Sequence, residues 1–192
     1  VNEKSQYCFF VCTTFDSFLN DLYIEQLKSN ITPNYLRDIQ PNHMACLLLS
    51  LIEQIEYGVE YQHTTIALAN MLAKKLEKYG FNIAKISDEV YTMTHQIFLL
   101  MTKKETDFFY NQALDYNISL NQKHKKLFSE DGIRLGTQQI ARYNWEEQDI
   151  DELAKLLFLI KHKGSLNEIK TIRKKLIDKK IPHFTYNEII IE

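Results

Sequence analysis

The arginine at position 134 is a residue of this chain whose type could bind a small anion. It lies in the stretch Asp-Gly-Ile-Arg-Leu-Gly-Thr-Gln-Gln-Ile, residues 131–140, where a brief extended segment is predicted over 133–135. A guanidinium presents a planar fork of N–H groups that matches a carboxylate through two parallel, charge-assisted hydrogen bonds. A short rigid strand would hold the direction of that fork. An ordinary surface ion pair is the alternative role of such an arginine.

A helix start and several histidines are the next candidates. Asn42 and His43 lie where a long helical pattern begins, and backbone N–H groups at such a place suit a phosphate. Asn42 as a plain N-cap is an equally good interpretation. His95 precedes a predicted strand, and a structural role is favoured for it. No metal site is predicted, since His63 and His124 have no partner at metal-ligand spacing and the sequence lacks H-E-x-x-H, C-x-x-C and phosphate-loop motifs.

The elements that would position these residues are helices alternating with short strands. Residues 7–12 are a continuous apolar run, typical of a strand buried on both faces, and a helix is expected from about Phe15. The further expected elements are helices over 42–55 and 65–79 with an interruption at Gly58, a left-handed cap at Gly80, strands over 81–84, 97–101, 118–120 and 133–135, helices over 104–116, 145–162 and 166–179, and an edge strand within 184–191.

These patterns predict an α/β chain in three parts. Residues 1–56 are expected to be the end of a large α/β domain followed by a bridging helix. Residues 57–163 are expected to form a small α+β domain, in which helices cover short strands. Residues 164–192 are expected to be a helical C-terminal extension.

Composition narrows the classes of partner. The 23 Lys and Arg against 25 Asp and Glu give a net charge of −2, which argues against a nucleic-acid or anionic-membrane binder. Three cysteines without framework spacing are typical of reduced thiols in a cytoplasmic protein. No apolar run approaches the ~20 residues of a membrane span.

Several segments, in order, resemble the C-terminal part of serine hydroxymethyltransferases and the related threonine aldolase-like or transaldolase-like enzymes. The most specific is Gly-Ile-Arg-Leu-Gly-Thr, residues 132–137, which resembles the G-I-R-x-G-T segment of that family. The supporting segments are Thr-x-x-His-Gln-Ile at 92–97, Asn-Ile-Ser-Leu-Asn at 117–121, the helix over 65–79 with Gly-Phe after it, and the acidic helix start at 145–154. The resemblance covers roughly residues 7–163.

The resemblance implies a fold-type I enzyme that uses pyridoxal 5′-phosphate (PLP) and acts on small amino acids. By that resemblance Arg134 binds the substrate α-carboxylate, and Asn42 and His43 lie at a turn that reaches the cofactor phosphate of the neighbouring subunit. It also implies a homodimer. Arg142 is the second basic residue of interest, and Asn144 stands where the family has a glycine, in a position that a left-handed asparagine can fill.

The lysine that would carry the cofactor as a Schiff base has no convincing candidate in the chain, because Lys4 lacks the usual Ser/Thr-His run before it. We therefore expect the N-terminal half of the enzyme on an upstream segment or a separate chain. Hydroxymethyl or aldehyde transfer, or aldol cleavage at Cα–Cβ, is the first hypothesis for the activity. The alternatives are a noncatalytic module for subunit pairing and part of a PLP aminotransferase or decarboxylase.

Overall fold

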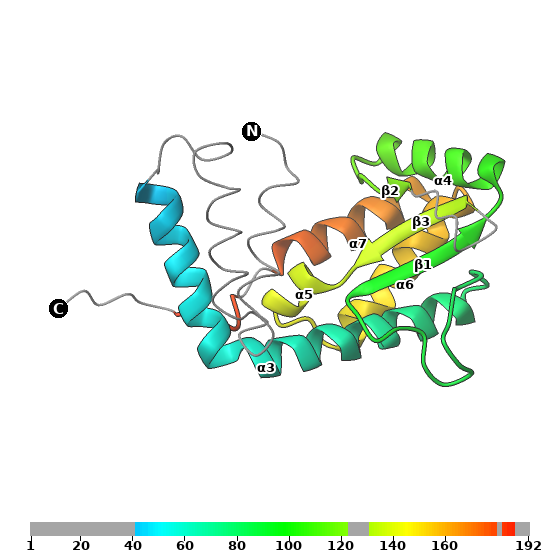
Figure 1. Cartoon of the computed structure of the whole chain (residues 1–192). Coiled ribbons are helices and arrows are strands. Elements are labelled where there is room, and N and C mark those ends of the chain that lie inside the picture. The colour runs from blue at the N-terminus through cyan, green and yellow to red at the C-terminus, as the bar shows by residue number, and fades with distance from the viewer. Residues whose placement is uncertain (1–40, 123–130, 180–181, 187–192) are drawn as a thin grey trace, which may run out of the picture. The chain divides into compact units, whose positions relative to one another are not determined.

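A computed structural model describes residues 41–122, 131–179 and 182–186 of the chain (Figure 1). The chain divides into two compact units, residues 1–51 and 52–192. The expected strand over 7–12 and the helix from about Phe15 lie outside the described residues. Unit 1 is described only from residue 41, where the first turns of helix α3 begin. Everything that follows on the sheet and its helices concerns unit 2.

Helix α3 (Pro41–Lys78) is one continuous helix, and the predicted interruption at Gly58 was wrong. A glycine inside a helix costs only about 1 kcal/mol relative to alanine, which a helix of this length tolerates when one of its faces is packed. The buried side chains of α3 are all in its later turns, where they recur every three or four residues: Thr65, Leu68, Ala69, Leu72, Ala73 and Leu76. Gly80 follows with φ of 81°, which confirms the expected left-handed cap.

Three short strands form an antiparallel sheet in the order β1-β3-β2, and β3 is therefore the central strand. Their bounds are Gln96–Met101 for β1, Asn121–Gln122 for β2 and Asp131–Gly136 for β3. The strand predicted over 118–120 was displaced, since pairing begins at Asn121. The strand predicted over 81–84 is reduced to a single bridge between Ile83 and Leu99.

The sheet has one buried face and one half-exposed face. Burial alternates along β1, where Ile97, Leu99 and Met101 are buried while the residues between them are half-buried. This alternation is expected where only one face of an antiparallel strand meets the core. The same core holds Leu72 from α3 and Ile133 from β3.

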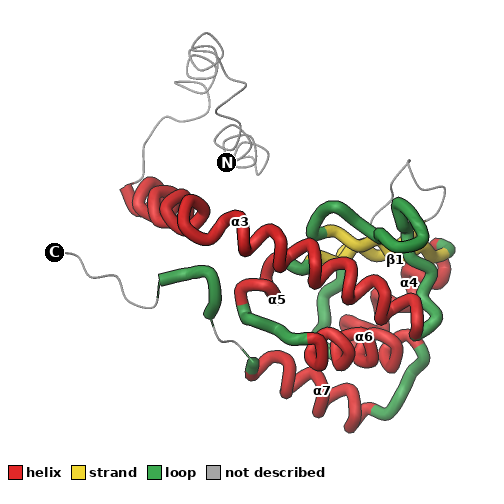
Figure 2. The backbone as a smooth tube through the Cα atoms, turned by 90° about the horizontal axis from the view of Figure 1, so that it is seen from below, coloured by secondary structure: helices red, strands yellow, loops and turns green. Residues whose placement is uncertain are grey.

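The described residues of unit 2 form four further helices, and Figure 2 shows α6 and α7 beneath the sheet in that view. They are α4 (Lys103–Asp115), α5 (Gln138–Arg142), α6 (Glu147–Lys161) and α7 (Leu166–Asp178). Helix α4 begins with a capping box between Thr102 and Glu105, a reciprocal pair of bonds that satisfies free backbone N–H groups. The short α5 was not predicted from the sequence.

Helix α7 packs on α6 and shares its core, with Ile169 and Leu176 buried. Ion pairs join the two helices at Lys155–Glu168 (2.6 Å) and Lys175–Glu152. The predicted edge strand within 184–191 falls mostly outside the described residues. Its described part, from Phe184 to Tyr186, is not a strand.

Candidate functional site

Arg134 lies on the central strand, on the half-exposed side of the sheet. The antiparallel register places it directly opposite Phe98 on β1 and opposite Asn121 on β2. Side chains of directly opposed residues share one face and lie within contact distance of one another. Arg134 is therefore the middle member of a row of three side chains, with an aromatic ring on one side and an amide on the other.

The guanidinium of Arg134 has an amide as its polar partner. Its Nη2 lies 2.7 Å from the side-chain oxygen of Asn121, in the amide orientation that also lets the Asn121 nitrogen donate to the carbonyl of Gln122 at 3.2 Å. Among the residues that the structure describes, the ion pairs involve other cations, and none joins a carboxylate to Arg134. The positive charge of Arg134 is thus oriented without being neutralised by a described carboxylate.

The two glycines that flank Arg134 differ in how much space a side chain would have at their positions. A Cβ on Gly132 would lie 1.9 Å from the backbone oxygen of Leu99, so only glycine allows β1 and β3 to approach this closely. A Cβ on Gly136 would make its nearest contact at an ordinary 3.6 Å, with Cδ2 of His95. Both positions, however, leave Arg134 without a neighbouring side chain two residues away along its own strand.

His95 is half-buried immediately before β1, near the end of β3. Burial lowers the pKa of its imidazole, and the nearby charge of Arg134 lowers it further. The ring is therefore held in its neutral form at pH 7, in which it can both donate and accept a hydrogen bond. Its Nε2 lies 3.3 Å from Nε2 of Gln96.

The end of β3 is fixed to its surroundings by Thr137. This buried residue donates from its N–H to the carbonyl of His95 at 3.2 Å, and from its hydroxyl to the carbonyls of Thr65 at 2.8 Å and His95 at 3.4 Å. The threonine of the Gly-Thr pair thus ties β3 both to the residue before β1 and to α3. It limits how far Arg134 can shift along the sheet.

Asn42 and His43, the candidates for phosphate contact, occupy the first turn of α3 and are exposed. That first turn contains no acidic residue, so the positive end of the helix has no adjacent carboxylate there. They lie in unit 1 and are considered apart from Arg134, which lies in unit 2.

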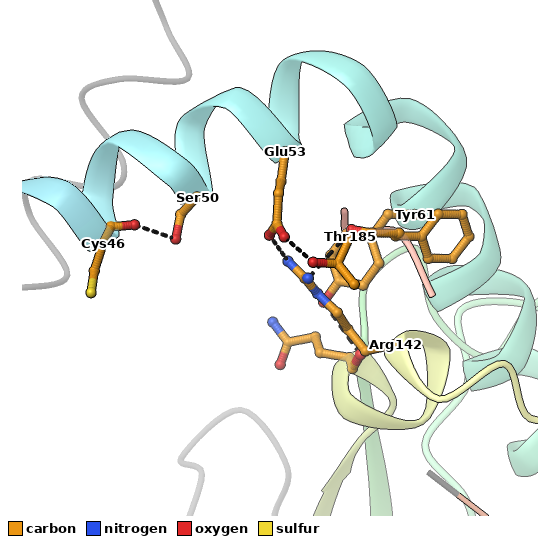
Figure 3. Close-up of polar contacts among 8 residues, drawn as sticks. Cys46, Ser50, Glu53, Tyr61, Arg142 and Thr185 are labelled. Atoms are coloured by element: carbon orange, nitrogen blue, oxygen red, sulfur yellow. Dashed lines mark hydrogen bonds and ion pairs between the residues drawn. The ribbon is translucent and has the colours of Figure 1, made fainter. Parts of the chain in front are cut away.

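A second arginine, Arg142 at the end of α5, sits in a very different environment (Figure 3). Its Nη2 pairs with the Glu53 carboxylate of α3 at 2.9 Å, and its Nη1 donates to the carbonyl of Phe184 at 3.3 Å. The guanidinium also lies over the ring of Tyr61 at 5.5 Å, a cation–π distance. Glu53 accepts a further hydrogen bond from the Thr185 hydroxyl.

The segment 182–186 docks onto α3 and α5 through this network. Phe184 is buried, takes a positive φ of 55° and packs edge-on against Tyr61 with ring centroids 5.8 Å apart. The N–H of His183 donates to the carbonyl of Arg142 at 2.8 Å, and the hydroxyl of Tyr186 donates to Glu56. We call residues 182–186 the C-terminal strap.

Sequence reasoning had singled out Arg142 but not its partners. Glu53 and Arg142 are 89 residues apart, and Thr185 is 132 residues from Glu53. Periodicity and local motifs report on neighbours along the chain, so they hold no signal for such pairs. The left-handed conformation expected at Asn144 is present, with φ of 50°.

The described residues offer neither a metal cluster nor a membrane-spanning helix. No group of three or more His, Cys, Asp or Glu is placed among them to hold a metal ion. None of the described helices combines the length and the apolar character needed to cross a membrane.

Comparison with known proteins relates the chain to one enzyme family. Serine hydroxymethyltransferases from Methanosphaera stadtmanae and Methanocaldococcus jannaschii are each 27% identical to it, over 134 and 147 residues. These matches cover 66% and 69% of this chain but 32% and 33% of the relatives, so the chain spans about a third of the length of the curated relatives it matches. No protein-family model matches the chain.

The fold has a relative among solved structures. The structure of L-threonine transaldolase from Pseudomonas fluorescens, in its internal aldimine state, matches 71% of this chain and 32% of its own, with a TM-score of 0.62 and 19% sequence identity. The matched part contains the mixture of helices and small antiparallel sheet described above. This chain is thus a partial homologue of the serine hydroxymethyltransferases, with the fold of the C-terminal part of such enzymes.

Proposed function

We propose that this chain supplies the substrate-carboxylate site of a PLP-dependent enzyme that acts on small amino acids, and that Arg134 holds the carboxylate. The observation that carries the proposal is the state of Arg134. It is half-buried on a central strand, has an amide partner, and forms no ion pair with a described carboxylate. Arg142, by contrast, is paired with the carboxylate of Glu53.

The surroundings of Arg134 suit a small anion in three ways. Gly132 and Gly136 add no side chain beside it on its strand. Its guanidinium retains N–H groups that Asn121 does not use, enough for a two-point contact with a carboxylate. The neutral ring of His95 can donate a hydrogen bond near the guanidinium.

The reaction that we propose is hydroxymethyl or aldehyde transfer, or aldol cleavage, at the Cα–Cβ bond of the amino acid. The cofactor, when bound, supplies an electron sink for the electron pair left on Cα. The contribution of this chain is positional. By fixing the carboxylate, Arg134 fixes the orientation of Cα, and such pre-orientation lowers the barrier of the chemical step.

The described residues do not by themselves make a cofactor site. Asn42 and His43 fit a phosphate contact to the extent that free N–H groups at a helix start attract an anion. We propose them as cofactor contacts on that ground. Lys4, the weak Schiff-base candidate, lies outside the described residues.

The partners follow from the same proposal. We propose that the N-terminal half of the enzyme is provided by an upstream segment or a separate chain, that the assembly is a homodimer, and that it works in the cytoplasm. A noncatalytic pairing module is the second candidate, favoured by exposed apolar side chains on α3 such as Ile55 (87% exposed) and Val59 (76%). An aminotransferase or decarboxylase would use the same carboxylate arginine, and analysis of the products from a β-hydroxy amino acid would separate it.

The experiment that tests the proposal is an absorbance spectrum of the natively isolated protein, with intact-mass analysis of every chain present. We expect a visible Schiff-base band that borohydride abolishes, with the reduced adduct on a longer polypeptide or a second chain. Added L-serine should perturb the band in the wild type and not in an Arg134→Met variant. A single 192-residue species without the band would overturn the enzymatic proposal and favour the pairing module.

A further inference from the structure

We infer that Asn121 is the positioning residue of the carboxylate site: its amide oxygen orients the Arg134 guanidinium while leaving the positive charge available to a ligand. The inference rests on the proposed function of Arg134 and adds a second residue to the site. It also assigns a reason for the residue type at position 121, because an amide and a carboxylate would both orient the arginine, but only the amide leaves its positive charge uncompensated.

The shortest strand of the sheet, β2, places Asn121 beside Arg134. Asn121 is the residue of β2 that pairs directly with Arg134, so both side chains emerge on the same face. The 2.7 Å contact between the Asn121 oxygen and Nη2 is short for an N–H···O bond, as expected when the donor carries a charge. The amide nitrogen is used as well, by the carbonyl of Gln122. An amide held at both ends cannot rotate freely, so it fixes the guanidinium in turn.

The strand that carries Asn121 is anchored to a helix. Gln122, the other residue of β2, donates from its side chain to the carboxylate of Asp107 on α4 at 3.3 Å. It also pairs with Ile133 of β3, whose side chain is buried. The position of the Asn121 amide is therefore set by β3 on one side and by α4 on the other. Arg134 receives its direction from this frame and not only from its own strand.

Charge explains why an amide suits this position. A carboxylate at 121 would form a close ion pair with Arg134, and an incoming ligand carboxylate would then face a neutralised pair and a competing anion. Two other groups near Arg134 also leave its positive charge uncompensated. His95 is held neutral, and Asp131, three residues earlier on β3, faces the opposite side of the sheet by the alternation of the strand.

The test uses the natively isolated protein, with every chain and the cofactor present, and nuclear magnetic resonance of the arginine side chain. The first readout is the order parameter of the Arg134 Nε–H group without ligand, in the wild type and in Asn121→Ala, Asn121→Asp and Asn111→Ala. Asn111 is an exposed residue of α4 and serves as the matched control. We expect Arg134 to be ordered in the wild type, in Asn121→Asp and in the control, and mobile in Asn121→Ala.

The second readout is the affinity for L-serine, with Arg134→Met as reference. Asn121→Ala should bind serine about 3- to 10-fold more weakly than the wild type, the loss expected for one hydrogen bond. Asn121→Asp should bind more weakly still at pH 7, although it orders Arg134. It should regain affinity only well below about pH 4, because the adjacent guanidinium lowers the pKa of the new aspartate.

The outcomes separate the two proposals. An order parameter of the Arg134 Nε–H group that is unchanged in Asn121→Ala overturns the positioning role, whatever the affinity for serine. Serine binding by Asn121→Asp that equals the wild type overturns the argument from charge. Serine binding that Arg134→Met leaves unaltered, or the absence of serine binding by all variants, overturns the carboxylate site itself and with it the purpose assigned to Asn121.

Discussion

Arg134 and Arg142 stand eight positions apart in the sequence, and the fold treats them in opposite ways. Arg142 is surrounded by a carboxylate, a backbone carbonyl and an aromatic ring, which together use its charge, its N–H groups and its flat face. Arg134 has one amide partner and no ion pair with a described carboxylate. The first arrangement is that of a structural junction, and the second is the one that the proposed carboxylate site requires.

The type of partner that an arginine has can separate arginines that stabilise the fold from those proposed to bind a ligand. Partner type is more informative than burial, because both side chains are partly buried. A carboxylate partner neutralises the charge and commits the arginine to the fold. A neutral acceptor orients the side chain and leaves the charge for another molecule.

The largest expected effect comes from replacing each arginine by methionine, which keeps most of the apolar stem. Arg142→Met should lower the free energy of unfolding by about 3 kcal/mol, because Glu53 is then left as a largely buried carboxylate without its cation. Arg134→Met should change it by less than about 0.5 kcal/mol. Urea denaturation of both variants measures the contrast, and equal losses would erase the distinction between the two sites.

The glycines beside Arg134 offer the next test. Gly132→Ala should cost about 2 kcal/mol of unfolding free energy and weaken serine binding, since the new methyl group would force β1 away from β3. Gly136→Ala is the matched control, because its Cβ meets only ordinary contacts. Thermal unfolding and serine titration of the pair report the effect. If Gly136→Ala proved as costly as Gly132→Ala, the close approach at Leu99 could not be the cause.

Removing the negative charge of Glu53 tests how much that charge contributes to its pairing with Arg142. Glu53→Gln keeps the size of the side chain but replaces a charged acceptor by a neutral one, and we expect a loss of about 1 kcal/mol. Hydrogen exchange should show faster opening around Tyr186 in the same variant, while β1 and β3 remain protected. Uniform loss of protection across unit 2 would contradict a local effect on the C-terminal strap.

The smallest effects are in the pH dependence, where the two regions should titrate in different windows. Burial raises the pKa of Glu53, but hydrogen bonds from Arg142 and Thr185 outweigh it, so the pKa lies below its ordinary 4.5. Its stabilising contribution is therefore complete above pH 4.5 and is lost as the pH falls through the folded-state pKa. His95 has a lowered pKa, so stability should begin to fall near its ordinary value of 6.5 as the unfolded chain takes up a proton first.

The free energy of unfolding, measured from pH 8 to 3, would show in which pH range each of the two residues affects stability. Glu53→Gln should remove the acidic part of the profile, and His95→Gln the part that begins near 6.5. A profile that neither substitution alters would show that other groups dominate the titration.

Much of the local structure could be predicted from the sequence. Helical spacing located α4, α6 and α7 to within two residues at each end, and the apolar runs located β1 and β3. These predictions succeeded because each element has an apolar period of its own. The break predicted at Gly58 failed because a local propensity of about 1 kcal/mol is overridden by the packing of a long helix.

The candidate site was only half visible in the sequence. Arg134 was a candidate through the Gly-Ile-Arg motif, and that assignment stays a prediction. The sequence indicated Asn121 only as the last residue of the segment 117–121 that resembles the family. Its contact with Arg134 depends on strand register, which the sequence does not show. The Glu53–Arg142 pair could not be seen at all, because it joins positions that are brought together only by the complete fold.

The C-terminal strap has a consequence for the order in which unit 2 is built. Glu53 and Glu56 lie near the start of the unit, yet Thr185 and Tyr186 lie 132 and 130 positions later. During synthesis, α3, the sheet and α6 can associate while these two carboxylates still lack their hydroxyl donors. Contacts of such long sequence separation form late, because the whole intervening loop must close first. The contacts of residues 182–186 with α3 therefore form after the earlier elements of the unit have associated, and until then Glu53 and Glu56 are open to water and to other donors.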